Sequence, residues 1–211
     1  MNGPHQGAWV QTQSGEDWFI HFQDKGALGR ITHLQPMKWK NDWPEIGIDL
    51  DGNGIGEPVI RNKKPTVGKN NSLNSLPSSD EFNETKLGLQ WQWHANPKVY
   101  WGFPTSLGYY MLNCIPKPKE MNTLWEVPNL LLQKFPSEEF KATAKITFQP
   151  RFDEEEVNFV VMGMNYSALK LKQVGGKFFL SHTIAKEGDK KGTEKETTPI
   201  PIPPNIVFFS S

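Results

Sequence analysis

Cysteine, net charge and long apolar runs are scarce in this chain of 211 residues, and each scarcity excludes a class of protein. The single cysteine, Cys114, excludes an internal disulfide and a cluster of thiolate ligands, and its apolar neighbours predict a buried thiol. Lysine plus arginine and aspartate plus glutamate number 23 each, so no charge excess points to nucleic acid or to an acidic membrane surface. Thiol chemistry and long-range ionic attraction are therefore not expected to underlie the function.

Targeting segments and membrane spans are also missing from the sequence. No apolar run approaches the ~20 residues that cross a bilayer, and residues 1–5 carry neither the basic region nor the apolar region of a signal peptide. The sequence therefore leaves the compartment open, and a secreted or periplasmic full-length protein is compatible with it. We do not expect Met1 to be the natural start of the protein.

The signatures of several catalytic classes are absent as well. The chain has no Gly-x-Ser-x-Gly elbow, no HExxH zinc motif and no phosphate-binding glycine loop. His21 and His33 alternate with apolar residues, which predicts structural histidines whose ring nitrogens are hydrogen-bonded. Four carboxylates lie at predicted turns, where solvation or capping is their ordinary role, and they nominate no matched pair for glycoside hydrolysis: Asp17, Asp24, Asp42 and Glu45.

Aromatic residues and turn formers are abundant. Aromatic residues make up 12% of the sequence, and eight tryptophans, 18 glycines and 17 prolines are typical of a β protein with many turns. The N-terminal residues predict a four-stranded antiparallel meander with strands at 8–12, 17–23, 30–35 and 37–39, and Pro36 is expected to end the third strand. Gly3 and Pro4 before His5, and Gly7 after it, predict a stiffly held histidine just ahead of the first strand. One such sheet cannot bury both of its faces alone, so we expect a partial propeller blade.

A loop rich in oxygen ligands follows the meander. Asp49, Asp51 and Asn53 alternate before glycines, as in the first half of a calcium loop, but Ile60 stands where the closing glutamate is expected. The sequence therefore allows either a bound calcium ion or a plain Asx turn at this place.

The rest of the chain divides into a linker and a second β domain. Residues 60–79 are polar and rich in Asn, Ser, Lys and Pro, which predicts a linker. Strand-length runs then recur at the intervals of a β-sandwich, at 87–93, 107–112, 127–133, 140–148, 157–164, 168–173 and 177–182.

Two segments near the end of the chain are not expected to form strands. The charged residues 186–196 predict a solvated hairpin loop, and the prolines of 200–209 are expected to interrupt any strand there. The predicted fold is all-β without a substantial helix, and the predicted domains are 1–59, 60–79 and 80–211. The last of these is expected to be a sandwich that stops before its final strands.

Two sets of residues resemble one known family. The first set comprises residues 3–9, 18–26, 29–30, 33–36 and 43–44. It resembles the last blade of the five-bladed β-propeller of glycoside hydrolase family 43. The second set comprises residues 80–82, 87–93, 96–97 and 108–110. It is similar to the start of the concanavalin-A-like β-sandwich that follows this propeller in β-xylosidases.

The resemblance implies both an activity and two site residues. It implies a full-length β-xylosidase or α-L-arabinofuranosidase that hydrolyses xylan- or arabinoxylan-derived oligosaccharides with inversion. His5 would then lie on the propeller axis beside a central calcium ion or its bound water, and Arg30 would reach toward the sugar and the general acid. A structural His5 and a surface-paired Arg30 are the alternatives. The family's three catalytic carboxylates belong to earlier blades, so this chain is expected to be inactive by itself.

Two other interpretations stay open. In the first, the sandwich is a carbohydrate-binding module that grips xylan through Trp91, Trp93, Trp101 and Trp125, which requires these rings to face solvent along a groove. In the second, the chain is a remnant that folds poorly, because open sheet edges and apolar faces invite aggregation.

Overall fold

The computed structural model describes residues 5–68, 75–190, 192–203 and 207–210. By its internal contacts the chain divides into an N-terminal unit, Met1–Ser75, and a C-terminal unit, Leu76–Ser211. The division falls inside the segment 60–79. Strands and three-residue 3-10 helices are the regular elements of the described residues, which confirms the all-β prediction. No helix of the described part of the chain is long and apolar enough to cross a membrane.

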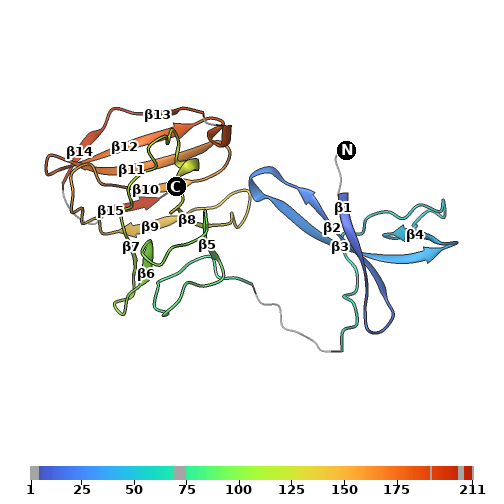
Figure 1. Cartoon of the computed structure of the whole chain (residues 1–211). Coiled ribbons are helices and arrows are strands. Elements are labelled where there is room, and N and C mark those ends of the chain that lie inside the picture. Colours follow the sequence, from blue (N-terminus) through green and yellow to red (C-terminus); the bar gives the residue numbers. More distant parts are fainter. Residues whose placement is uncertain (1–4, 69–74, 191, 204–206, 211) are drawn as a thin grey trace. The chain divides into compact units, whose positions relative to one another are not determined.

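The N-terminal unit is a four-stranded antiparallel sheet with the spatial order β1-β2-β3-β4 (Figure 1). Its elements are β1 (His5–Gln11), β2 (Asp17–Asp24), the 3-10 helix η1 (Gly26–Leu28), β3 (Arg30–Lys40) and β4 (Trp43–Ile46). The predicted meander is present, but its fourth strand is Trp43–Ile46 and not the segment 37–39.

Pro36 does not stop the third strand; it marks the point where β3 changes partners. β3 pairs with β2 as far as Pro36 and with β4 beyond it. The Pro36 carbonyl accepts a hydrogen bond from Gly47 N at 2.8 Å, and proline has no N–H to leave unpaired. The turn between β3 and β4 has positive φ at both Asn41 and Asp42, as tight two-residue hairpins require. The segment 37–39 is therefore the second half of one long strand.

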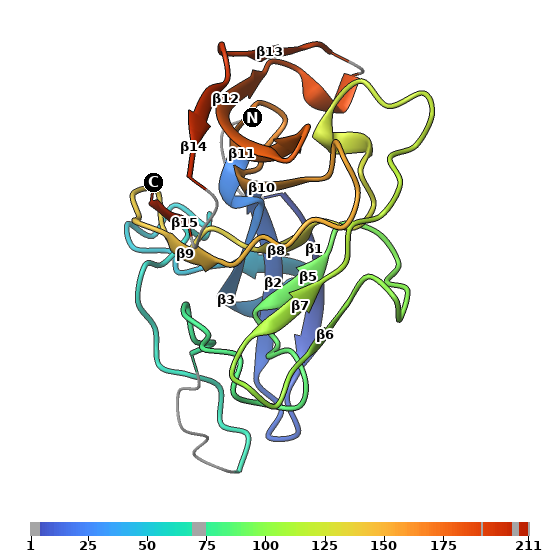
Figure 2. The same cartoon turned by 90° about the vertical axis from the view of Figure 1, so that its left-hand side faces the viewer.

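The C-terminal unit contains one five-stranded sheet and three two-stranded sheets (Figures 1 and 2). The large sheet has the order β10-β11-β12-β13, with β14 also paired to β12, and the small sheets are β15-β9, β5-β8 and β6-β7. Their bounds are β5 (Trp91–Trp93), β6 (Gly102–Pro104), β7 (Tyr110–Leu112), β8 (Leu131–Gln133), β9 (Thr143–Ile146), β10 (Glu156–Val161), β11 (Tyr166–Val174), β12 (Lys177–Ala185), β13 (Glu194–Glu196), β14 (Ile200–Ile202) and β15 (Val207–Ser210).

The end of the chain is more regular than its sequence predicts. The predicted solvated loop ends in β13, whose Glu196 pairs with Thr183 of β12. The proline-rich tail forms β14, with Pro201 opposite Phe179, and then β15. Pro201 is tolerated because, within the described part of the chain, β14 pairs with β12 alone, so its missing N–H interrupts no second ladder.

The core of the C-terminal unit lies between its large sheet and the 3-10 helix η2 (Leu124–Glu126). Leu124, Tyr166, Ala168 and Ala185 are each at most 4% exposed and form one cluster. Cys114 lies outside this cluster and is exposed, which corrects the prediction of a buried thiol. Partial burial, together with nearby glutamates, raises the pKa of its thiol, so exposure does not make it a reactive thiolate.

Candidate functional site

His5 lies at one end of the N-terminal sheet. It opens β1 as the register partner of Phe22, and a bulge with Gln6 at φ 51° separates it from the next pair, Gly7 and His21. Gly7 is required there, because a Cβ would stand 2.3 Å from the carbonyl oxygen of Ile20. The backbone of His5 is therefore fixed by the bulge that follows it. Gly3, Pro4 and the imidazole itself lie outside the described residues.

Arg30, the second residue with an implied role, begins β3 and is exposed. Its guanidinium lies over the Phe22 ring, 4.7 Å from the ring centroid. A guanidinium stacked in this way is oriented by the ring and keeps N–H groups available to donate to a ligand oxygen. Phe22 is also the backbone partner of His5, so the sheet places His5 and Arg30 beside the same residue of β2.

The loop after β4 is held together by the three side chains that the sequence offers as calcium ligands. Asp49 accepts hydrogen bonds from Gly52 N at 2.8 Å and Gly54 N at 3.0 Å. Asp51 accepts from the backbone and side-chain nitrogens of Asn53 at 3.2 and 3.0 Å. Burial acts to raise the pKa of Asp49, but the backbone amides that donate to its carboxylate lower it on balance. The geometry is that of an Asx turn.

A calcium ion at this loop fits the observed geometry poorly. The oxygens of Asp49, Asp51 and Asn53 already accept hydrogen bonds within the loop, including one from Ile55 N to Asn53 at 2.7 Å. Among the described residues, no group of three or more His, Cys, Asp or Glu side chains is placed to hold a metal ion. Calcium at this loop stays a prediction, and the Asx turn accounts for the conformation without it.

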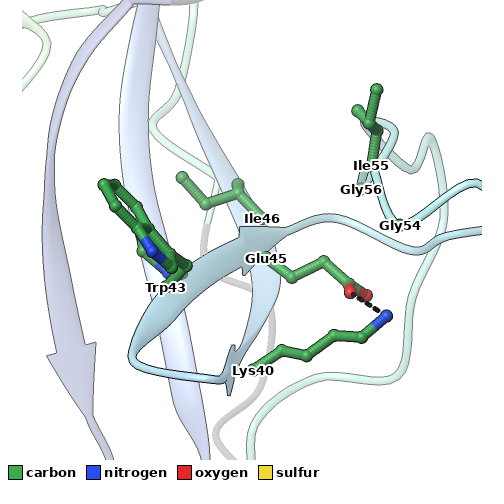
Figure 3. Close-up of a pocket in the computed structure, with 8 residues that line it drawn as sticks. Lys40, Trp43, Glu45, Ile46, Gly54, Ile55 and Gly56 are labelled. Atoms are coloured by element: carbon green, nitrogen blue, oxygen red, sulfur yellow. Dashed lines mark ion pairs between the residues drawn. The ribbon is translucent and has the colours of Figure 1, made fainter.

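A surface pocket of about 360 Å³ lies between β4 and this loop (Figure 3). It is lined by Lys40, Trp43, Pro44, Glu45, Ile46, Gly54, Ile55 and Gly56. Figure 3 shows the Glu45 and Lys40 side chains pointing toward each other, with the Trp43 ring on the other side of β4. Trp43 is 77% exposed, and its ring points away from Glu45 and from the loop at Gly54.

Glu45 is a buried carboxylate that the sequence analysis assigned to a solvated turn. Its side chain is 4% exposed and pairs with Lys38 Nζ at 2.7 Å and Lys40 Nζ at 3.7 Å. Lys38 lies opposite Glu45 in the hairpin and Lys40 lies two residues further along β3, so the strand register itself could have revealed this ion pair. A buried carboxylate held between two ammonium groups is a structural charge pair.

The tryptophans proposed to grip xylan mostly lie inside the C-terminal unit. Trp101 is 3% exposed and meets the ring of Trp93 at a centroid distance of 5.5 Å. Trp91 is half-buried, donates from Nε1 to Asp80 at 2.7 Å and packs on Phe82. Trp125, also half-buried, stacks edge-on against His94. One of the four rings is buried and the other three are half-buried, which favours a packing role.

His21 and His33 face each other across β2 and β3, with ring centroids 5.7 Å apart. Their positions in strands are as predicted. Their Nε2 atoms, however, are buried without a hydrogen-bond partner, which corrects the expectation of satisfied rings. Burial lowers the pKa of His21, and the neighbouring His33 lowers it further.

Comparison with known proteins adds a family to this geometry. Residues 79–210 match the family described as the beta-xylosidase C-terminal concanavalin A-like domain of glycoside hydrolase family 43. A protein of Xylanibacter ruminicola with a provisional beta-xylosidase name is 36% identical over 189 residues, which cover 89% of this chain and 32% of that relative. A non-reducing end alpha-L-arabinofuranosidase of Bacteroides ovatus is 28% identical, covering 72% of this chain and 28% of that relative.

Solved structures agree in fold. The crystal structure of a xylan beta-1,4-xylosidase from Bacillus halodurans matches with a TM-score of 0.73 at 21% identity, over 98% of this chain and 40% of that one. A bifunctional GH43-CE protein of Bacteroides eggerthii matches with a TM-score of 0.73 at 23% identity, over 99% of this chain and 26% of that one. The chain thus spans about a third of the curated relatives named above. Through residues 79–210, this chain belongs to glycoside hydrolase family 43, in the group that carries the beta-xylosidase C-terminal concanavalin A-like domain.

Proposed function

We propose that the full-length protein hydrolyses O-glycosyl bonds of xylan- or arabinoxylan-derived oligosaccharides with inversion, and that this chain does not hydrolyse them by itself. The observation that carries the proposal is the family match over residues 79–210. The names of the relatives, beta-xylosidase and alpha-L-arabinofuranosidase, support the substrate class. In this proposal the N-terminal sheet is the last blade of a β-propeller.

The carboxylates of this chain support the second half of the proposal. Inversion needs a general acid and a general base about 6.5–9.5 Å apart, and the acid needs a raised pKa. Against the opposing effect of burial, hydrogen bonds lower the pKa of Asp49 and of Glu196, so neither carboxyl is suited to be the acid. Glu45, the buried one, is already paired with Lys38 and Lys40. We therefore place the acid and the base on residues that precede this chain.

The proposed contribution of this chain to the active site is cationic and positional. Arg30, braced on Phe22, would donate hydrogen bonds to a sugar hydroxyl, and its positive charge would tune the acidity of a neighbouring carboxylic acid. His5 would stand beside a calcium-bound water at the propeller axis. If a calcium ion also binds the loop at Asp49, Asp51 and Asn53, it would stiffen the pocket beside β4 and take no part in catalysis.

The test measures hydrolysis directly. The purified chain is incubated with p-nitrophenyl β-D-xylopyranoside and p-nitrophenyl α-L-arabinofuranoside, and release of p-nitrophenol is compared with buffer. We expect no release above the buffer rate, and turnover would overturn the assignment of both catalytic carboxylates to other residues. In the full-length protein, proton NMR of the first sugar released should show the inverted anomer, and a retained anomer would overturn the mechanism.

A further inference from the structure

The β6–β7 hairpin of the C-terminal unit has two unlike faces. Side chains alternate along its strands, so Tyr110 and its neighbours in register point to one face and Phe103 to the other. Tyr110 packs against Phe82 and Trp93, with centroid distances of 5.7 and 6.4 Å, and so points to the inside of the unit. The face that carries Phe103 is therefore the outer one.

The outer face displays large apolar side chains to solvent. Phe103, Tyr109 and Met111 are 48%, 43% and 37% exposed. Phe103 lies opposite Met111, and Tyr109 pairs with Thr105 through a backbone hydrogen bond of 3.0 Å. Tyr109 is thus diagonal to Phe103, which places the two aromatic residues about 7–8 Å apart on one face. We call Phe103, Tyr109 and Met111 the hairpin platform.

The hairpin that carries the platform is uncharged along its own sequence. Residues 99–116 contain no Asp, Glu, Lys, Arg or His. The hairpin itself therefore offers no ionic contact to an acidic or basic ligand, and it matches a neutral one. Neutral ligands that suit exposed aromatic rings include sugars, whose C–H faces stack on a ring while their hydroxyls stay in water.

The platform is also pre-organised. At the turn, Thr105 Oγ1 donates to the Tyr109 carbonyl at 2.8 Å, and Gly108 supplies the positive φ that the turn needs. At the base, Asn113 N donates to the Trp101 carbonyl at 2.9 Å, and the Asn113 side chain donates to the Tyr100 carbonyl at 2.8 Å. A platform fixed at both ends loses little conformational freedom when a ligand binds.

We propose that the hairpin platform binds a neutral oligosaccharide chain, with successive sugar rings stacked on Phe103 and Tyr109. The ligand class follows from the two rings and from the absence of charge. The choice of a β-linked pentose chain, as in xylan, rests on the proposed function. This site is distinct from the four tryptophans first considered for sugar binding, because Phe103 and Tyr109 face outward.

The test is retardation of the chain in native gels that contain soluble arabinoxylan, followed by calorimetric titration with xylohexaose. We expect retardation of the wild-type chain. The double variant Phe103→Ala/Tyr109→Ala should lose it, with affinity for xylohexaose reduced by about tenfold or more. The matched control is Phe152→Ala, which removes a 73% exposed phenylalanine elsewhere in the same unit and should migrate like wild type. Circular dichroism of each variant establishes that it is folded.

The other possible results of this experiment either change the ligand assigned to the hairpin platform or overturn the platform itself. Retardation by a neutral glycan other than xylan, lost in the double variant, keeps the platform and removes the xylan assignment. Equal retardation of wild type, double variant and Phe152→Ala overturns the platform, as does no retardation by any neutral glycan. If the double variant converts a self-associated chain to a monomer in sedimentation without changing glycan binding, the face is a protein contact and the proposal is wrong. None of these results depends on hydrolysis, so they are separable from the test of the proposed activity.

Discussion

Replacing Tyr166 by phenylalanine is expected to destabilise the C-terminal unit by about 2 kcal/mol. Tyr166 is 3% exposed, and its hydroxyl donates to Glu194 and accepts from Leu124 N at 2.6 Å. This contact ties β11 to β13 and to η2. A hydrogen bond to a charged group contributes about 1.5–3 kcal/mol. Because Leu124 N keeps a second acceptor, Glu194 Oε1 at 2.9 Å, the lower half of that range applies.

The assay is urea unfolding followed by circular dichroism, with hydrogen exchange of β13 as a local measure. The matched control is Tyr100→Phe, because Tyr100 is 52% exposed and should change the free energy of unfolding by less than about 0.5 kcal/mol. A double-mutant cycle with Glu194→Gln should give a coupling free energy above about 0.5 kcal/mol. Equal urea midpoints for Tyr166→Phe and Tyr100→Phe would refute the reasoning.

The contact between Tyr166 and Glu194 also predicts how the stability of the C-terminal unit changes at alkaline pH. Burial, and then the hydrogen bond to Glu194, raise the pKa of Tyr166. The folded state therefore favours the protonated phenol, and this stabilisation is complete below the ordinary tyrosine pKa of about 10. It is lost as the pH rises above that value through the folded pKa. Stability measured from pH 8 upward should fall less steeply in Tyr166→Phe than in wild type, and parallel curves would contradict the assignment.

Three further predictions concern other contacts. Burial opposes a low pKa at Glu196, but the hydrogen bond from Lys170 lowers it on balance, so the stability it adds should be lost as the pH falls from about 4.5 through the folded pKa. Urea midpoints of Glu196→Gln should therefore fall less steeply than those of wild type over that window. Burial lowers the pKa of His21, so the sheet should lose stability as the pH falls below about 6.5, and His21→Phe should remove this slope in acid titrations followed by circular dichroism. Gly7→Ala should destabilise the N-terminal sheet by about 1–3 kcal/mol, because its Cβ would stand 2.3 Å from Ile20 O; an unchanged melting temperature would refute the close approach.

Local pattern predicted much of the N-terminal sheet and misjudged where strands end. The alternation of apolar residues and the glycine-bearing turns predicted the meander correctly. The prediction that Pro36 ends the third strand was wrong. A proline ends a strand only where its missing N–H would be needed for pairing, and β3 changes partners at this residue. The same reasoning applies to Pro201 in β14. Whether a proline is tolerated depends on which edges are paired, and that information is not local.

Burial and pairing were the least predictable features of the candidate site. The position of Glu45 beside turn residues suggested solvation, whereas its ion pairs follow from hairpin register with Lys38 and Lys40. Composition suggested that tryptophans present a sugar-binding surface, yet Trp101 is buried. Aromatic content does not reveal which rings face outward. Alternation within the β6–β7 hairpin could have pointed to Phe103, had the segment 102–104 been recognised as a strand.

The first half of β3 pairs with β2 as far as Pro36, and the second half pairs with β4 from Met37 onward. One continuous strand is therefore shared by two separate hairpins. Pro36 has no backbone N–H, so it donates no hydrogen bond to either hairpin at the point where they meet. Detachment of the β4 hairpin can therefore end at this boundary. The remaining sheet, in which β1, β2 and β3 stay paired, would keep His5 opposite Phe22 and Arg30 opposite Asp24.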